Sequence, residues 1–171
     1  MAGEMSWEKR FEILSQINRA SHFEWRRAAL KACPGLDPMK LVLAYWEEVG
    51  HDTAKAYIKH FRKRLEQDPD ASLAEMVADS FVFSSVSMGE DAKRVSEKES
   101  PGHAYMRHDA CPWKDWHERF DLIEEDRPGC DMWLKTLIDD INQEFGSKIT
   151  FKTIEALPEG GSCCLRHVWE D

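Results

Sequence analysis

The sequence lacks the long apolar runs and the glycine-rich loops that identify several large classes of protein. No stretch approaches the roughly 18 consecutive apolar residues of a membrane span, and the first residues contain no apolar segment of the kind found in signal peptides. A phosphate-binding glycine loop, a Gly-x-Ser-x-Gly nucleophile elbow and a dinucleotide fingerprint are all absent. We therefore expect a cytoplasmic protein that has no membrane partner and uses no nucleotide cofactor.

Basic residues are also scarce relative to acidic ones. The 171 residues include 23 Lys and Arg against 32 Asp and Glu, which gives a formal net charge of -9. Phosphate contacts need clustered Lys and Arg, so this balance disfavours nucleic acid as a partner. The densest basic run, residues 59–64, is followed by acidic residues and would spread over several faces of a helix. We interpret it as a solvated surface.

Cysteine occurs five times, an odd number without regular spacing. Such a set does not fit the disulfide framework of a small secreted domain, and it suits thiols that are kept reduced or thiolates that bind a metal.

The 42% hydrophobic and 11% aromatic content is enough for a packed core in a chain of this length. We expect a single domain.

Apolar residues recur with helical spacing through residues 1–88. Cap residues and Pro or Gly breakers divide this stretch into five predicted helices. They are 7–20 after Ser6, 21–33 before Pro34-Gly35, 38–50 after Asp37, about 52–66, and 73–86 after Ser72. The first part of the chain is therefore predicted to form a helical layer.

Residues 89–171 mix strands and helices. Alternating patterns around turn residues predict two hairpins, with strands at 92–99 and 103–109 and at 149–154 and 163–169. Helices are expected from Cys111-Pro112 to Phe120 and from Gly129 to Phe145. The prediction is an α+β domain in which the N-terminal helices pack on a small antiparallel sheet and cover one of its faces.

Side chains that bind metals or take part in catalysis gather in the last third of the chain. They are Cys111, His117, Cys130, Asp131, Glu155, Cys163, Cys164 and His167. Thiolate, imidazole and carboxylate groups are the ligands of Zn²⁺ and other transition metals. No Cys-x-x-Cys or His-x-x-x-His spacing is present, and free cysteines are also common as small core residues. A metal site and ordinary buried thiols are both open interpretations.

A cysteine nucleophile is a third interpretation. A thiol becomes nucleophilic when a cation, a helix N-terminus or a metal lowers its pKa. Cys111 precedes one predicted helix and Cys130 lies near the start of another, while His117 could act as an acid or base. Trp113 and Trp133 could line a pocket, although their helical spacing suits a core equally well.

Three short motifs resemble the L-2-amino-thiazoline-4-carboxylate hydrolase family. They are Cys111-Pro112-Trp113, Gly129-Cys130-Asp131 and the run Glu-Gly-Gly-Ser-Cys-Cys-Leu-Arg at 159–166. The likeness covers about residues 90–170. It extends more distantly to the 4-vinyl-reductase-type ligand-binding domain, which shares a late strand with a Gly, a short gap, a Cys and apolar residues. The chain departs from the hydrolase pattern at 142–146, where Asn-Gln-Glu-Phe-Gly stands instead of a Gly-Phe-Asn-Pro-like turn.

The resemblance implies hydrolytic opening of a cyclic thiazoline or amidine-type carboxylate. Water adds to the C=N carbon and the carbon–sulfur bond breaks, which requires an activated water or thiolate and a cation for the carboxylate. The candidate catalytic residues are Cys111, His117, Cys130 and Asp131. The candidate substrate-binding residues are Arg107, Trp113, Trp133 and Arg166. The candidate ligands of zinc or another transition metal are Cys130, Glu155, Cys163 and Cys164.

The more distant likeness implies a different class of function. In that hypothesis the protein is a small-molecule-binding or sensing domain, its cysteines hold a structural zinc, and it catalyses no reaction. A zinc-stabilised interaction protein is a third class. A small molecule is the expected partner as substrate or as ligand, and a homo-oligomer is compatible with each hypothesis.

Overall fold

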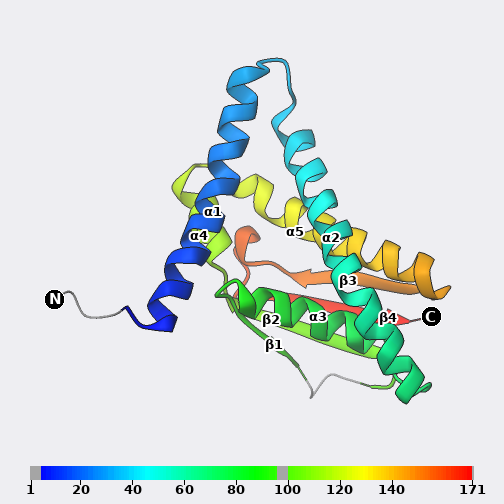
Figure 1. The fold of residues 1–171 in the computed structure, drawn as a ribbon. Helices are drawn as coiled ribbons and strands as arrows, with labels where there is room; N and C mark the ends of the chain where they lie inside the picture. Colours follow the sequence, from blue (N-terminus) through cyan, green and yellow to red (C-terminus); the bar gives the residue numbers. More distant parts are fainter. Residues whose placement is uncertain (1–4, 96–99, 171) are drawn as a thin grey trace.

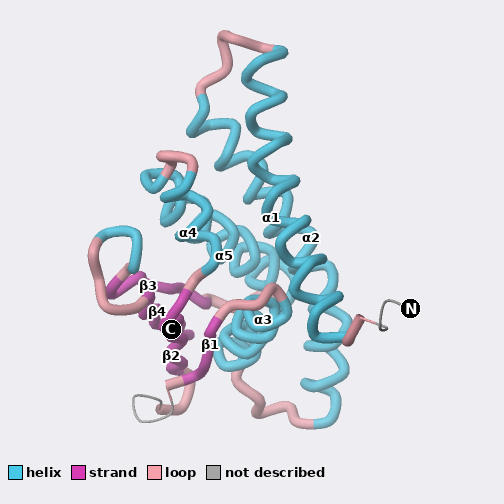
Figure 2. Tube along the Cα trace, turned by 90° about the vertical axis from the view of Figure 1, so that its left-hand side faces the viewer, coloured by secondary structure: helices cyan, strands magenta, loops and turns pink. Residues whose placement is uncertain are grey.

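The computed structural model describes residues 5–95 and 100–170. The helices are α1 (Trp7–Ala32), α2 (Pro38–Gln67), α3 (Leu73–Ser87), α4 (Pro112–Arg119), α5 (Ile123–Phe145) and the short 3-10 helix η2 (Leu157–Glu159). The strands are β1 (Asp91–Arg94), β2 (His103–Ala110), β3 (Ile149–Glu155) and β4 (Cys164–Glu170). The helices lie on one side of the sheet (Figures 1 and 2), which confirms the predicted α+β arrangement.

The sheet is antiparallel, with the strand order β1-β2-β4-β3. The last strand, β4, lies between β2 and β3, so that Met106 is opposite Arg166 and Phe151 is opposite Val168. Alternate residues of a strand point to opposite faces, and every second residue of β2 is buried against the helices. Both predicted hairpins are confirmed, although residues 96–99 of the first lie outside the described residues.

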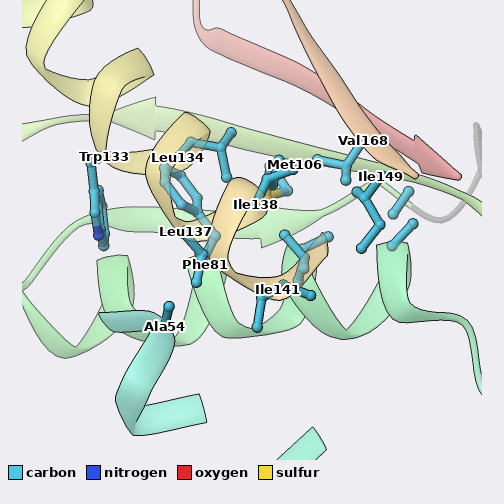
Figure 3. Packing of buried hydrophobic residues seen from close by; sticks show 14 of the residues in the cluster. Ala54, Phe81, Met106, Trp133, Leu134, Leu137, Ile138, Ile141, Ile149 and Val168 are labelled. Carbon is cyan, nitrogen blue, oxygen red and sulfur yellow. The ribbon is translucent and has the colours of Figure 1, made fainter. Parts of the chain in front are cut away.

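Helix α5 forms the centre of the core between α2 and the sheet. Its apolar side chains point toward α3 and the inner face of the sheet (Figure 3). The buried residues of this cluster include Ala54, Phe81, Met106, Trp133, Leu134, Leu137, Ile138, Ile141, Ile149 and Val168. The C-terminal half of α5 is therefore held by apolar packing from both sides.

Two glycines allow α2 and α5 to approach closely. A Cβ atom at Gly50 would lie 2.6 Å from the Cβ of Thr136, and one at Gly129 would lie 2.5 Å from the Cδ1 of Trp46. The sequence prediction placed Gly50 at the end of a helix, and this was wrong because α2 continues through it to Gln67. Close packing against α5 offsets the low helix propensity of glycine there.

Two other predicted helix boundaries were wrong. Ser21 does not cap a new helix, since its hydroxyl donates to the carbonyl of Ile17 at 2.9 Å and α1 continues to Ala32. Helix α5 begins at Ile123 and includes Pro128, so Cys130 lies inside the helix rather than near its start. The predicted N-caps were correct, because Ser6, Asp37 and Ser72 each accept a backbone N–H from the first turn of their helix.

Within the described residues, no helix combines the length and the apolar character that a membrane crossing requires. The apolar face predicted for α1 is present but points outward. Trp7, Phe11, Leu14 and Ile17 are exposed, and the side of the helix that carries Ser15, Arg19, His22 and Phe23 packs against the rest of the protein.

Candidate functional site

A charged cluster lies where the first turns of α5 pack on β4, and Arg166 is at its centre. The Arg166 side chain is buried, and its Nη2 donates to the sulfur of Cys130 at 3.2 Å and to the Oδ1 of Asp131 at 3.4 Å. Its Nε finds no hydrogen-bond partner among the described residues. A buried guanidinium is stable only when paired, so the position of Asp131 is essential to this cluster.

Asp131 connects the buried arginine to the surface. Its Oδ1 also accepts from the hydroxyl of Thr153 at 2.8 Å, and its Oδ2 accepts from the Nε of Arg127 at 3.2 Å. Arg127 in turn forms an ion pair with Glu159 on η2. The four charged groups therefore form a continuous chain from the inner face of the sheet to solvent, and each link is a charge-assisted hydrogen bond.

The outer end of this chain lines a surface groove of about 320 Å³. We call it the arginine groove, and its lining residues are Ile123, Glu124, Arg127, Pro128, Pro158 and Glu159. Ile123, Pro128 and Pro158 are its apolar lining residues, and Arg127 supplies a cation. The hydrogen bond from Arg127 to Glu159 and the neighbouring Asp131 raise the pKa of Arg127, which is therefore always charged.

The two predicted nucleophiles are in surroundings that suppress their ionisation. Burial raises the pKa of the Cys130 thiol well above its ordinary value, although the charge of Arg166 opposes this shift. Burial also raises the pKa of Cys111, and the carboxylates of Glu90 and Asp126 add to the effect. A reactive thiolate needs the opposite shift. Both environments thus disfavour the predicted nucleophile role.

The predicted metal ligands are divided between two places. The sulfur of Cys163 lies 3.7 Å from the Oε2 of Glu155, and Cys164 accepts the backbone N–H of Leu157 at 3.3 Å. Cys130 contacts the Arg166 guanidinium, whose positive charge repels a metal cation. Among the residues that the structure describes, no three His, Cys, Asp or Glu side chains are placed to hold a metal ion. The structure therefore gives the zinc hypothesis no support.

Arg107 does not join the cluster. It lies on β2 opposite Leu165 and forms an ion pair with Asp109. Its neighbour Met106 is buried beneath the helices, and alternation along the strand places Arg107 on the other face of the sheet from Arg166. The two arginines predicted to bind a substrate carboxylate therefore lie on opposite faces of the sheet.

His117 and the two tryptophans are part of the interior. The Nδ1 of His117 is 2.9 Å from the Oδ2 of Asp126, the carboxylate that also raises the pKa of Cys111 and Cys130. Three of the predicted catalytic residues therefore share one buried region. Trp113 and Trp133 both contact the ring of Trp46, with centroid distances of 5.3 Å and 6.1 Å, so they belong to the aromatic core rather than to the groove.

The sequence prediction missed Arg127, Thr153 and Glu159. One signal was available for the first of these. Arg127 and Asp131 are four residues apart, which is the spacing of an ion pair along one helix face. The signal was hidden because the helix was expected to begin at Gly129. No local pattern relates Thr153 or Glu159 to α5.

Neither a known protein family nor a curated protein matches the sequence. Among solved structures, trafficking protein particle complex subunit 3 from Naegleria fowleri, covalently bound to palmitic acid, has a TM-score of 0.55 and 11% identity. The match covers 94% of this chain and 96% of that one. An H-NOX protein from S. oneidensis has a TM-score of 0.48 and 11% identity, with 99% and 78% coverage. At this identity the first likeness shows a shared fold alone, and the resemblance to the hydrolase family is not confirmed.

Proposed function

We propose that this protein is a small-molecule-binding module and that its ligand is an apolar monocarboxylate held in the arginine groove. The observation that carries the proposal is the position of Arg127, a fixed cation beside the apolar side chains of Ile123 and Pro158. A groove of about 320 Å³ is at the lower end of the range of about 300–1,000 Å³ for ligand pockets. A ligand of modest size fits these dimensions.

Arg127 is the one cation among the described residues that line the groove, and it is the group that would hold a ligand carboxylate. A guanidinium matches the two oxygens of a carboxylate, and the Nη1 of Arg127 already donates to one carboxylate oxygen of Glu159. Glu159 is 55% exposed, and an ion pair at such a surface contributes only about 0–1 kcal/mol. A ligand carboxylate can therefore replace Glu159 at little cost. Glu124 adds negative charge to the lining, which disfavours a ligand with two negative charges.

The buried part of the cluster orients Arg127 for binding. Asp131 is held by Thr153 and by Arg166, and it accepts from the Nε of Arg127. This contact leaves the Nη atoms of Arg127 directed toward the groove side, where Glu159 is bound. A side chain that is already oriented loses less conformational entropy when the ligand binds.

The Naegleria protein with the same fold supports the proposal, because it is covalently bound to palmitic acid, an apolar carboxylic acid. The surroundings of Cys130 and Cys111 disfavour a covalent link at either of these two thiols. Burial keeps Cys130 and Cys111 as neutral thiols, so we propose a ligand that binds without a covalent bond.

A hydrolase is the second candidate function, and one observation favours it. The structure brings Cys130, Asp131 and Arg166 together, as the hydrolase hypothesis requires. The raised pKa of the Cys130 thiol and the pairing of Asp131 with two arginines count against it. Release of a thiol from 2-amino-thiazoline-4-carboxylate would identify this activity, and we expect none above the rate without protein.

The proposal is tested by calorimetric titration with saturated carboxylates from butanoate to dodecanoate, with the corresponding primary alcohols for comparison. We expect the carboxylates to bind and the alcohols to bind at least about tenfold more weakly, because they carry no charge for Arg127. Arg127→Met should abolish the difference between the two series. The matched control is Arg62→Met, which removes another surface arginine that pairs with a glutamate, Glu144. Carboxylate binding that is unchanged in Arg127→Met would refute the proposal.

A further inference from the structure

A row of large apolar side chains on α1 is exposed. Trp7 is 78% exposed, Leu14 is 64% and Ile17 is 55%, and Phe11 lies between them at 45%. The spacing of three and four residues places these side chains on one face of the helix. The buried residues of α1 are Ser15, Arg19, His22 and Phe23, and they lie beside this row rather than in it. The exposed face is therefore not needed to attach α1 to the rest of the protein.

The end of α3 lies beside this row, because Ser87 and Met88 line the same groove as Phe11 and Leu14. Phe83 and Val86 of α3 are 65% and 49% exposed. Between the two helices lies a groove of about 250 Å³, lined by Phe11, Leu14, Ser15, Asn18, Arg19, Ser87 and Met88. Arg19 connects its two sides, because its Nη1 donates to the carbonyl of Met88 at 2.7 Å. We define the α1–α3 face as Trp7, Phe11, Leu14, Ile17, Phe83 and Val86.

We propose that the α1–α3 face is the interface of a homodimer and that its occupant is a second copy of this chain. An aromatic side chain buries roughly 150–250 Å², so six large side chains that are about half exposed present on the order of 600 Å² of apolar surface. This is at the upper limit of patches on monomers, roughly 300–600 Å². A standard interface needs roughly 800 Å² from each partner, polar rim included.

A two-fold interface requires a self-complementary surface, and this face offers both an exposed ring and a groove. Trp7 protrudes from the same surface that contains the groove. In an antiparallel pair of α1 helices, a two-fold axis midway between Phe11 and Leu14 places these two residues opposite each other. The same axis places Trp7 opposite Asn18 of the partner subunit, at the lining of the groove. Each copy thus supplies one protruding ring and one groove.

The charges beside the face favour a second copy over a lipid surface. Helices that lie on membranes are rich in Lys and Arg on their polar face. In the first turns of α1, Glu8 and Glu12 flank Lys9 and Arg10, and the Lys9 ammonium pairs with Glu12 at 2.8 Å. The whole chain carries a net charge of -9, which an anionic lipid surface would repel.

The experiment is sedimentation equilibrium of the full chain over a range of concentrations. We expect the wild-type protein to have twice the mass of the 19.9 kDa chain at micromolar concentration. Leu14→Glu places a charge in the centre of the face and should raise the dimer dissociation constant at least about 100-fold. The matched control is Leu36→Glu, which changes an exposed leucine in the loop between α1 and α2 and should leave the dimer intact.

Three results would overturn the proposal. They are a wild-type monomer at about 100 μM, a Leu14→Glu variant that is folded and still dimeric, and binding to phosphatidylserine vesicles that the wild type shows and Leu14→Glu loses. If circular dichroism shows that Leu14→Glu is unfolded, the Trp7→Ala variant tests the dimer instead, because truncating an exposed ring does not alter the core. Trp7→Ala should then raise the dissociation constant at least about tenfold.

Discussion

The two halves of helix α5 lie in opposite kinds of surroundings. The C-terminal half contributes Leu134, Leu137 and Ile141 to a core without charge, and the N-terminal half contributes Cys130 and Asp131 to a chain of ion pairs. Apolar packing gains free energy from every buried group, whereas a buried ion pair barely offsets the loss of hydration of its charges. The comparison indicates that the C-terminal half of α5 contributes more to the stability of the fold than the N-terminal half, to which we assign the proposed binding role.

The largest expected effect comes from the apolar half. Leu137→Ala removes a fully buried side chain between α2 and the sheet, and it should lower the free energy of unfolding by about 3–5 kcal/mol. Urea denaturation followed by circular dichroism measures this change. Leu36→Ala, at an exposed loop position, is the control and should stay within about 0.5 kcal/mol of the wild type. A loss below about 1 kcal/mol for Leu137→Ala would show that α5 does not hold the core.

Arg166→Met tests the charged half and should have the next largest effect. It leaves Asp131 partly buried with only Thr153 and Arg127 as partners, so we expect a loss of about 2–3 kcal/mol. The double variant Arg166→Met/Asp131→Asn removes both charges and should recover most of this loss. If the double variant is no more stable than the single one, Arg166 contributes by packing and not by its charge.

The buried histidine of α1, His22, should make the stability of the protein depend on pH. Burial, together with the neighbouring His117 and Arg26, lowers the pKa of His22 to about 4. In the unfolded chain His22 binds a proton near pH 6.5, whereas in the folded protein it does so only near pH 4. The free energy of unfolding is therefore highest above pH 6.5 and falls as the pH decreases toward 4. We expect about 2 kcal/mol less stability at pH 5 than at pH 7.5. In His22→Phe this slope should flatten, and an unchanged slope would assign it to other groups.

The smallest effect on stability should come from Arg127→Met, although it should remove the preference of the groove for carboxylates. The ion pairs of Arg127 with Asp131 and Glu159 are about one-third exposed, and such pairs contribute about 0–1 kcal/mol. Thermal unfolding should therefore give nearly the wild-type midpoint. A loss above about 2 kcal/mol would mean that Arg127 is a structural residue, and the arginine groove would lose its main support.

Much of the local structure could be predicted from the sequence. Ser6, Asp37 and Ser72 begin their helices as expected, because an N-cap needs only a side-chain oxygen and the three residues that follow it. The hairpin of β3 and β4 was predicted for a similar reason, since alternation and turn residues are local signals. The continuation of α2 through Gly50 was not predictable, because it depends on the contact with Thr136 of α5.

The candidate site was predicted in part. Cys130, Asp131 and Arg166, three of the predicted site residues, lie in contact, whereas Arg107 lies on the other face of the sheet. The contribution of Arg127 was missed because it required the correct start of α5. The direction of the cysteine pKa shifts also could not be predicted from the sequence, since it depends on burial and not on neighbours in sequence.

By itself, the sequence determined the class of the fold, the helix caps, the turns and the residue types available for binding. These depend on backbone hydrogen bonds and side-chain spacing within a few residues. The tertiary structure alone decided that Arg166 would be buried against Asp131, that Arg127 would line a groove and that the apolar face of α1 would point outward. Each of these outcomes depends on which distant surfaces come into contact, because burial changes the energy of a charge or an apolar side chain and local sequence does not specify burial.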